Sequence, residues 1–258
     1  MRTLVAIPVY NEEKHACRVL SMVLKYADHV LVIDDGSTDG THRLLDKFPV
    51  DVIRHFRNRG YGRSLTDSFY WSRQGNSMSD GGFDWLITMD CDEQHEPAAI
   101  PMFLEEAAKG THDVISGSRY LTTLEGDDRP PADRQVINAT ITQELNERLG
   151  LNLTDSFCGF KAYRVSALEK LVLTEPGYAF PMQFWVQAVA AKLRIKEVPV
   201  KLIYNDLNRT FGGPLNDPEI RLAHYRKVLH CELKRCADRL PASALDDITL
   251  KCGTTSCV

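Results

Sequence analysis

The chain has 258 residues, of which 43% are hydrophobic and 26% charged, the composition of a globular protein large enough to bury one sizeable core. Its formal net charge of −4 excludes a general attraction to nucleic acid or to an anionic bilayer, so any phosphate recognition must be local. The seven cysteines are odd in number and scattered, which argues against a secreted disulfide framework and favours a reducing cytoplasm.

Strands and helices alternate in the first part of the chain. The apolar run at residues 3–9 is too short for a signal peptide and is predicted to be the first strand. Asn11 is a candidate cap for the helix that follows, and Pro97 is suited to open a later one. Further strands are expected at 29–33, 50–55, 85–89 and 113–116, with helices at 11–26, 40–47, 64–72 and 97–109. This alternation predicts an α/β fold with a mostly parallel central sheet flanked by helices.

The pattern changes after Tyr120. Residues 121–133 lack periodicity and are rich in Gly and Pro, which is typical of a functional loop such as a lid. The elements then expected are a helix at 132–149, a strand with a turn at 157–164, a helix at 180–192, a strand at 194–204, a polar loop at 207–217 and a helix at 220–240. No stretch approaches the roughly 18 apolar residues of a membrane-spanning helix. We therefore expect one domain at 1–217, and a helical appendage with a tail at 218–258.

Two carboxylates follow the fourth predicted strand directly. Asp90 and Asp92 come after the apolar run 85–89, and Gln94 adds an amide two residues on. Open α/β sheets bind ligands at such strand ends, and carboxylate and amide oxygens suit Mg²⁺ or Mn²⁺ shared with phosphates. The alternative is that these residues only cap the helix that Pro97 opens. His95 is a candidate metal ligand or a structural hydrogen-bonding group.

Five strings in order resemble glycosyltransferase family 2. They are Ile7-Pro8-Val9-Tyr10-Asn11-Glu12, Ile33-Asp34-Asp35-Gly36-Ser37-Thr38-Asp39-Gly40-Thr41, Asp90-Cys91-Asp92, Gly117-Ser118-Arg119-Tyr120 and Asp155-Ser156-Phe157-Cys158-Gly159-Phe160-Lys161-Ala162-Tyr163-Arg164. The last two strings, with Gln94 and His95, are similar to the dolichyl- or polyprenyl-phosphate mannose synthase branch. The resemblance covers roughly residues 3–204.

The resemblance implies a GT-A fold, a GDP- or UDP-hexose donor, a divalent cation (Mg²⁺ or Mn²⁺) and inversion at the anomeric carbon. The donor-binding residues it implies, together with those the strand-end positions favour, are Pro8, Tyr10, Glu12, Asp35, Asp90, Arg119 and Arg134. Asp90, Asp92 and Gln94 form the predicted metal site, and Asp92 and Arg119 are predicted to act in the transfer itself. Arg209 is a further candidate for phosphate binding.

The acceptor is predicted to be a polyprenyl phosphate. Gln183 stands where the family usually carries Glu, so it cannot serve as a base, whereas a phosphate monoester needs none at neutral pH. Phe211 and Gly212 replace the family's usual Ser-Lys and weigh against that acceptor. Transfer to a sugar or small-molecule hydroxyl, with Asp155 as base, is the alternative; Asp155 could also be a structural turn residue. A catalytically silent nucleotide-sugar-binding protein is a third possibility.

The tail concentrates four cysteines, Cys231, Cys236, Cys252 and Cys257. Their spacing allows a zinc site, a redox pair or ordinary thiols. We expect no nucleic-acid partner and a cytoplasmic enzyme with peripheral membrane contact. The oligomeric state is left open by the sequence.

Overall fold

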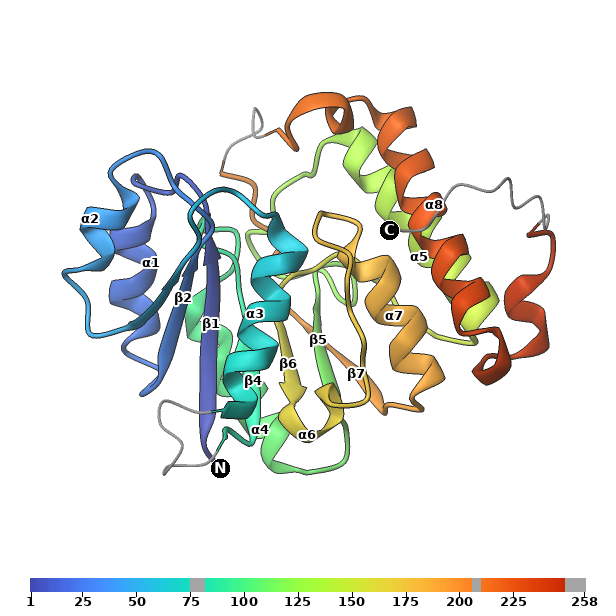
Figure 1. Ribbon diagram of the computed structural model, residues 1–258, viewed down its shortest axis with the longest axis horizontal. Helices are drawn as coiled ribbons and strands as arrows, with labels where there is room; N and C mark the ends of the chain where they lie inside the picture. Colours follow the sequence, from blue (N-terminus) through green and yellow to red (C-terminus); the bar gives the residue numbers. More distant parts are fainter. Residues whose placement is uncertain (75–81, 206–209, 249–258) are drawn as a thin grey trace.

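The computed structural model describes residues 1–74, 82–205 and 210–248 and has a seven-stranded sheet at its centre with helices on both faces (Figure 1). The strands are β1 (Thr3–Val9), β2 (Val30–Asp34), β3 (Asp51–Arg54), β4 (Trp85–Thr88), β5 (Val114–Ser118), β6 (Lys161–Arg164) and β7 (Ile195–Pro199). The α-helices are α1 (Ala16–Val23), α2 (Thr41–Leu45), α3 (Tyr61–Gln74), α4 (Ile100–Ala108), α5 (Ala132–Leu149), α6 (Val165–Leu168), α7 (Phe180–Ala190) and α8 (Pro218–Arg235). Short 3-10 helices lie at Pro97–Ala99, Gly213–Asn216, Ala237–Arg239 and Ala242–Leu245.

The strand order is β3-β2-β1-β4-β6-β5-β7, and the sheet is mostly parallel as predicted. The exception is β6, which runs antiparallel to both β4 and β5, with Thr88 opposite Lys161 and Trp85 opposite Arg164. Its reversed direction puts the start of β6 at the edge of the sheet where β4 ends. The segment before β6 therefore lies beside the Asp90–Asp92 loop.

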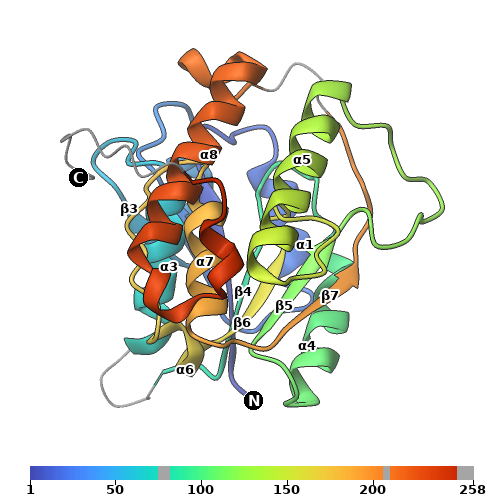
Figure 2. The same cartoon turned by 90° about the vertical axis from the view of Figure 1, so that its right-hand side faces the viewer.

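Two hydrophobic cores cover the two faces of the sheet. Alternate residues of β1 face opposite cores, with Leu4 and Ala6 in one and Val5 and Ile7 in the other. The first core takes its buried side chains from α3, α5, α7 and α8, and the second from α1, α2 and α4. Figure 2 shows α5, α7 and α8 gathered on one side of the sheet. Because both faces are covered, β2, β4 and β5 are buried at every residue.

The first predicted helix begins later than expected. Asn11 does not cap it, because α1 begins at Ala16 and its N-cap residue is His15. Asn11 instead adopts a positive φ of 57°, and its side-chain oxygen accepts a hydrogen bond of 2.8 Å from the backbone N–H of Thr38. Asparagine tolerates this conformation better than most residues. The side chain thus joins the loop after β1 to the loop after β2.

The second half agrees closely with the predicted helices. The bounds of α5 are those expected, and Asp217 caps α8 by accepting hydrogen bonds from the N–H groups of Glu219 and Ile220. The expected boundary at residue 217 therefore coincides with a helix start. The buried side chains of α8 belong to the same core as those of α7.

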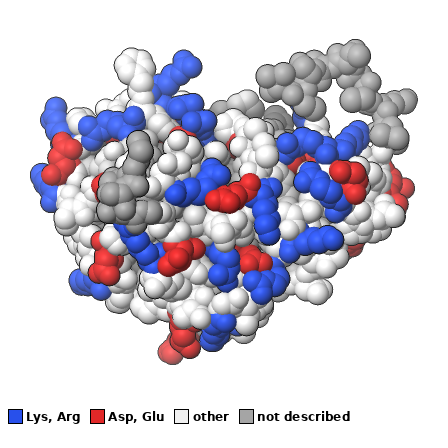
Figure 3. Space-filling model, turned by 60° about the horizontal axis from the view of Figure 1, so that its bottom comes forward, with Lys and Arg blue, Asp and Glu red and all other residues white. Residues whose placement is uncertain are grey.

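The surface shows no continuous single-sign field on the face that includes the lower end of the molecule. Lys and Arg are interspersed with Asp and Glu there (Figure 3), in keeping with the small net charge of −4. Within the three described stretches of chain, none of the helices combines the length and apolar character needed to cross a membrane.

Candidate active site

A pocket of about 420 Å³ opens where β1, β2 and β4 end and the segment before β6 begins. Its wall also takes residues from α5, from the start of α7 with the two residues Gly177 and Tyr178 before it, and from α8. Nine of the predicted site residues line it: Pro8, Tyr10, Glu12, Asp35, Asp90, Asp92, Gln94, Arg119 and Arg134. The structure thus brings together side chains that lie more than 120 positions apart in the sequence.

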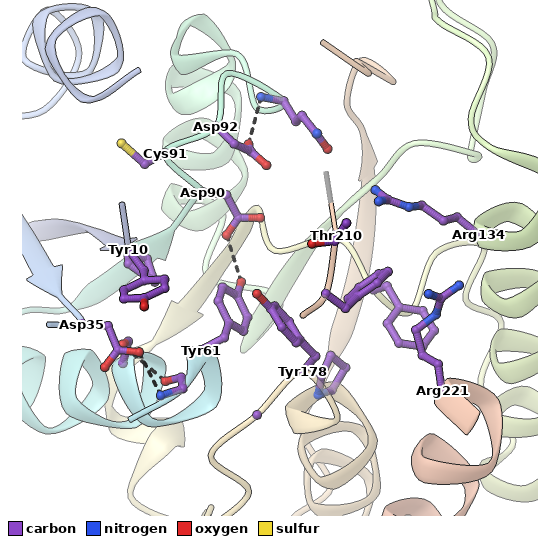
Figure 4. Close-up of a pocket in the computed structure, with 18 of the residues that line it drawn as sticks. Tyr10, Asp35, Tyr61, Asp90, Cys91, Asp92, Arg134, Tyr178, Thr210 and Arg221 are labelled. Carbon is purple, nitrogen blue, oxygen red and sulfur yellow. Dashed lines mark hydrogen bonds between the residues drawn. The ribbon is translucent and has the colours of Figure 1, made fainter. Parts of the chain in front are cut away.

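Asp35 anchors the end of the pocket formed by β1 and β2. The residue is 4% exposed, and its two oxygens accept hydrogen bonds of 2.8 Å from the backbone N–H groups of Arg59 and Gly60. Gly60 has a φ of +100°, and a Cβ there would stand 2.3 Å from the carbonyl oxygen of Pro176. A glycine is therefore needed for the loop to reach Asp35. Tyr10, on the same side of the pocket, is 44% exposed and offers a free ring face (Figure 4).

Asp90 and Asp92 project from one loop into the space between the Asp35 side and the arginine side of the pocket, while Cys91 points away (Figure 4). Asp90 Oδ1 accepts a hydrogen bond of 3.0 Å from the hydroxyl of Tyr61. Asp92 Oδ1 accepts one of 3.0 Å from the backbone N–H of Gln94. The short helix at 97–99 has no side-chain cap, so these carboxylates do not serve as its cap.

His95 supports this loop from behind. Its ring is 6% exposed, and Nδ1 accepts a hydrogen bond of 2.9 Å from the backbone N–H of Asp90. Its ring also packs against Phe160 with centroids 5.3 Å apart. This geometry favours the interpretation of His95 as a structural hydrogen-bonding group over its interpretation as a metal ligand.

Tyr61 is a pocket residue that the sequence does not indicate, because its partner Asp90 lies 29 residues away on another element. Burial, followed by the negative charge of Asp90, raises the pKa of its hydroxyl well above the usual value, so the group remains a hydrogen-bond donor. Gly159 leaves room for this contact. A Cβ on Gly159 would stand 2.6 Å from the Tyr61 hydroxyl and 2.8 Å from Asp90 Oδ2.

The donor set fits a hard cation that shares its ligands with a substrate. Among the described residues, no group of three or more His, Cys, Asp and Glu side chains is placed to hold a metal on its own. Asp90 and Asp92 offer carboxylate oxygens, and Gln94, which also lines the pocket, offers an amide oxygen. Mg²⁺ is typically held by one or two carboxylates together with substrate phosphates and water. The pocket therefore suits a cation that arrives with a phosphorylated ligand.

Arg119 is held in place by Asp155. The guanidinium donates from Nε to Asp155 Oδ2 at 2.6 Å and from Nη2 to Oδ1 at 3.0 Å. Asn138 Nδ2 also donates to Asp155 Oδ1, at 2.8 Å. Burial would raise the pKa of Asp155, but the charge and hydrogen bonds of Arg119 outweigh burial and lower it to about 2. Asp155 is 0% exposed and does not line the pocket. This geometry favours a structural carboxylate and gives no support to a general base.

Arginines and aromatic rings form the opposite wall. The Arg134 guanidinium lies 5.1 Å from the centroid of the Phe211 ring, and that of Arg221 lies 4.4 Å from the same ring. Arg221 is 3% exposed and donates to Asp133 Oδ2 at 2.6 Å. The sequence does not indicate a role for Arg221 in the pocket, because Arg221 is one of many charged residues on a predicted helix. Arg209 lies outside the described residues.

Gln183, predicted not to serve as a base, lies away from the pocket. Its side-chain oxygen accepts from the backbone N–H groups of Thr174 and Glu175, and its Nε2 donates to Glu232 Oε2 at 3.0 Å. Gln183 therefore faces α8 rather than the pocket, which its neighbour Pro181 lines. The absence of a carboxylate at this position carries no information on a catalytic base.

The tail cysteines are only partly placed. Cys236 is buried, with its Sγ 3.5 Å from Glu232 Oε1, and Cys231 is half-buried on α8. Cys252 and Cys257 lie outside the described residues, so a zinc site or a redox pair formed by these cysteines stays a prediction.

Comparison with known proteins places this pocket in a family. Residues 4–172 match the model of glycosyl transferase family 2. The chain belongs to this family. It is 30% identical to a polyprenol monophosphomannose synthase of Mycolicibacterium smegmatis over 239 residues, covering 87% of this chain and 86% of the relative. It is 29% identical to an undecaprenyl-phosphate mannosyltransferase of Micrococcus luteus over 237 residues, covering 87% and 94%. The predicted resemblance to the polyprenyl-phosphate mannose synthase branch is confirmed.

A solved structure supports the fold of this family-2 glycosyltransferase. A glucosyl-3-phosphoglycerate synthase of Mycobacterium tuberculosis, in complex with Mn²⁺, uridine diphosphate and glucosyl-3-phosphoglycerate, superposes with a TM-score of 0.64. The match covers 93% of this chain and 81% of that chain at 18% identity. The predicted GT-A fold is confirmed.

Proposed function

We propose that the protein transfers a hexose, mannose or glucose, from a nucleotide-diphosphate sugar to a polyprenyl phosphate, with inversion and with the help of Mg²⁺ or Mn²⁺. One observation carries the proposal: a pocket with Asp90 and Asp92 on one wall has Arg134 and Arg221 across from them. The acidic wall suits a cation with a diphosphate, and the basic wall suits a second phosphate. The names of the two mannosyl-transferring relatives support a lipid-phosphate acceptor.

Each part of the pocket has a role in this proposal. Tyr10 and Asp35 hold the base and ribose of the donor, whose base is guanine or uracil. Asp90, Asp92 and Gln94 hold the cation, which when bound offsets the charge of the departing nucleoside diphosphate. Arg119, whose Nε and Nη2 are held by Asp155, contacts phosphate through the remaining N–H groups of its guanidinium.

The acidic residues favour a phosphate acceptor over a hydroxyl. Among the described residues that line the pocket, the carboxylates are Glu12, Asp35, Asp90 and Asp92, all at the donor and metal end. A hydroxyl acceptor would need a base on the arginine side, and Asp155 is committed to Arg119 there. A phosphate monoester has a second pKa of about 6 and is a nucleophile at neutral pH without a base. A polyprenyl phosphate is a membrane lipid, so the proposed reaction takes place at a membrane surface, and we propose the cytoplasmic side.

A donor and acceptor panel tests the proposal. GDP-mannose and UDP-glucose, each radiolabelled in the sugar, are incubated with Mn²⁺ or Mg²⁺ and with polyprenyl phosphate, a free sugar or no acceptor. We expect label in the lipid fraction only with a cation and polyprenyl phosphate. Label on the free sugar would support the hydroxyl alternative. The absence of both transfer and donor hydrolysis would indicate a silent binding protein.

An Asp92→Asn variant tests the metal role in the same assay. Transfer should fall by about 100-fold or more, because the loss of one charge weakens the cation site. The thermal midpoint should stay near that of the wild type, since Asn can still accept the bond from Gln94. Asp238→Asn, at a side chain that is 77% exposed, is the matched control and should transfer normally. Near-normal turnover of the Asp92 variant would contradict the assignment.

A further inference from the structure

His55 lies buried between two carboxylates at the donor end of the pocket. It follows β3 and is 7% exposed. Its Nδ1 stands 2.6 Å from Asp35 Oδ1, and its Nε2 stands 2.9 Å from Asp67 Oδ2 on α3. His55 does not itself line the pocket, whereas Asp35 does.

Each of the two carboxylates that His55 contacts also accepts hydrogen bonds from other groups. Asp35 also accepts from the N–H groups of Arg59 and Gly60, and Asp67 also accepts from Arg63 Nε at 2.9 Å. The ring of His55 thus bridges two carboxylates that are each held by further donors. Its contact of 2.6 Å with Asp35 Oδ1 is shorter than the two backbone hydrogen bonds of 2.8 Å to the same carboxylate.

We propose that His55 is a positioning residue for the donor nucleotide: the imidazole ring, held on its other side by Asp67, fixes the Asp35 carboxylate that faces the nucleotide. This inference rests on the proposed function, because it takes the ligand at Asp35 to be a nucleoside diphosphate. The chain of contacts runs from Arg63 through Asp67 and His55 to Asp35, so α3 and the residue after β3 set the orientation of the carboxylate that follows β2. The loop at 59–60 fixes the same carboxylate from its other side.

Two isosteric substitutions separate the contacts of the ring. The amide nitrogen of Asn stands near the position of Nδ1, so His55→Asn keeps a donor for Asp35. The amide nitrogen of Gln reaches the position of Nε2, so His55→Gln keeps a donor for Asp67 and leaves Asp35 without its side-chain partner. The two variants remove similar amounts of buried structure and are matched controls for each other.

The experiment measures UDP and GDP affinity by calorimetry in the presence of Mn²⁺, together with the donor KM, kcat and thermal midpoint. His55→Gln should weaken the nucleotide that the wild type binds by about tenfold, with a parallel rise in KM and little change in kcat. His55→Asn should stay within about threefold of the wild type. Equal affinities in the two variants, or equal losses that follow the thermal midpoint, would overturn the proposal. If the wild type binds neither nucleotide, the proposed function fails and this inference fails with it.

Nitrogen-15 NMR of the wild-type ring provides a test that needs no variant. The Nδ1 signal should shift on addition of UDP or GDP, while the Nε2 signal should shift less. An Nδ1 signal indifferent to a nucleotide that binds would overturn the proposal.

Discussion

Gly159 shows at the residue scale how a missing side chain shapes the site. Its Cα lies against the Tyr61 hydroxyl and both oxygens of Asp90, with no room for a methyl group. Thr88 fixes the same residue by donating from Oγ1 to its carbonyl at 2.8 Å. The position of Asp90 thus depends on a glycine 69 places later, on the segment that leads into β6.

Substitution of Gly159 by Ala should damage activity more than stability. The added Cβ would push Tyr61 and Asp90 out of place, and misplacement of a reacting group by about 1 Å can cost about 100-fold in rate. We expect a loss of that order in transfer and weaker Mn²⁺-dependent nucleotide binding. Gly110→Ala is the control for activity: a Cβ there meets nothing within 4 Å, so this variant should keep normal transfer, although its φ of +68° should lower its stability. A Gly159 variant with normal turnover would show that this contact does not fix Asp90.

The positions that a sequence can indicate are those whose neighbours in the chain share their role. Asp90, Asp92 and Gln94 could be predicted because a single strand end delivers them together. Tyr61 and Arg221 could not, because each reaches the pocket only through packing of its helix against other elements.

At the scale of elements, the contact between α7 and α8 explains the glutamine at position 183. Gln183 and Gln187 both donate to the carboxylate of Glu232, at 3.0 and 2.8 Å, and Arg235 forms an ion pair with it. Glu232 is 4% exposed and needs these donors. The amide at 183 therefore secures α8 against α7.

Gln183→Glu, which restores the residue usual in the family, should destabilise the protein. A second carboxylate would face Glu232 in a buried site, at an expected cost of about 3 kcal/mol in the free energy of unfolding. Urea denaturation measures the loss. Gln143→Glu is the matched control, because Gln143 also contacts a glutamate, Glu147, but on an exposed face of α5; its effect should stay below about 0.5 kcal/mol. A gain in activity in the Gln183 variant would support a catalytic role for a carboxylate at this position.

Helix and strand positions could be predicted more fully than strand direction. The α5 bounds follow from the pattern, and each predicted strand of the first half is present. The reversal of β6 could not be read, because a short buried strand has the same pattern in either direction. The prediction that Asn11 caps a helix was wrong because a residue suited to capping a helix is also suited to a positive φ.

The whole molecule is expected to be sensitive to acid through Asp155. The folded-state pKa of about 2 lies below the ordinary value of 3.8, so the folded state favours the ionised form. The resulting stabilisation is present above about pH 4 and is lost as the pH falls toward 2. It amounts to about 2 kcal/mol, from the usual conversion of about 1.4 kcal/mol for each pKa unit.

Denaturant unfolding at pH 5, 4, 3 and 2.5 tests this expectation. The free energy of unfolding should fall over this range, and Asp155→Asn should lose about 2 kcal/mol less than the wild type on acidification, although it starts from a lower value because Arg119 loses its partner. Asp238→Asn should follow the wild-type curve. Identical slopes for Asp155→Asn and the wild type would show that this carboxylate has no depressed pKa in the folded protein.

The reversal of β6 has a consequence for how such an enzyme can diversify. The segment that precedes β6 supports two parts of the pocket. Its Asp155 holds Arg119, and its Gly159 lies against Asp90. A replacement within it that suits a new acceptor would disturb the surroundings of Asp90 as well. Under the proposed function, variation in acceptor preference among descendants of this scaffold should therefore accumulate on α8, whose Arg221 lines the pocket from a separate element.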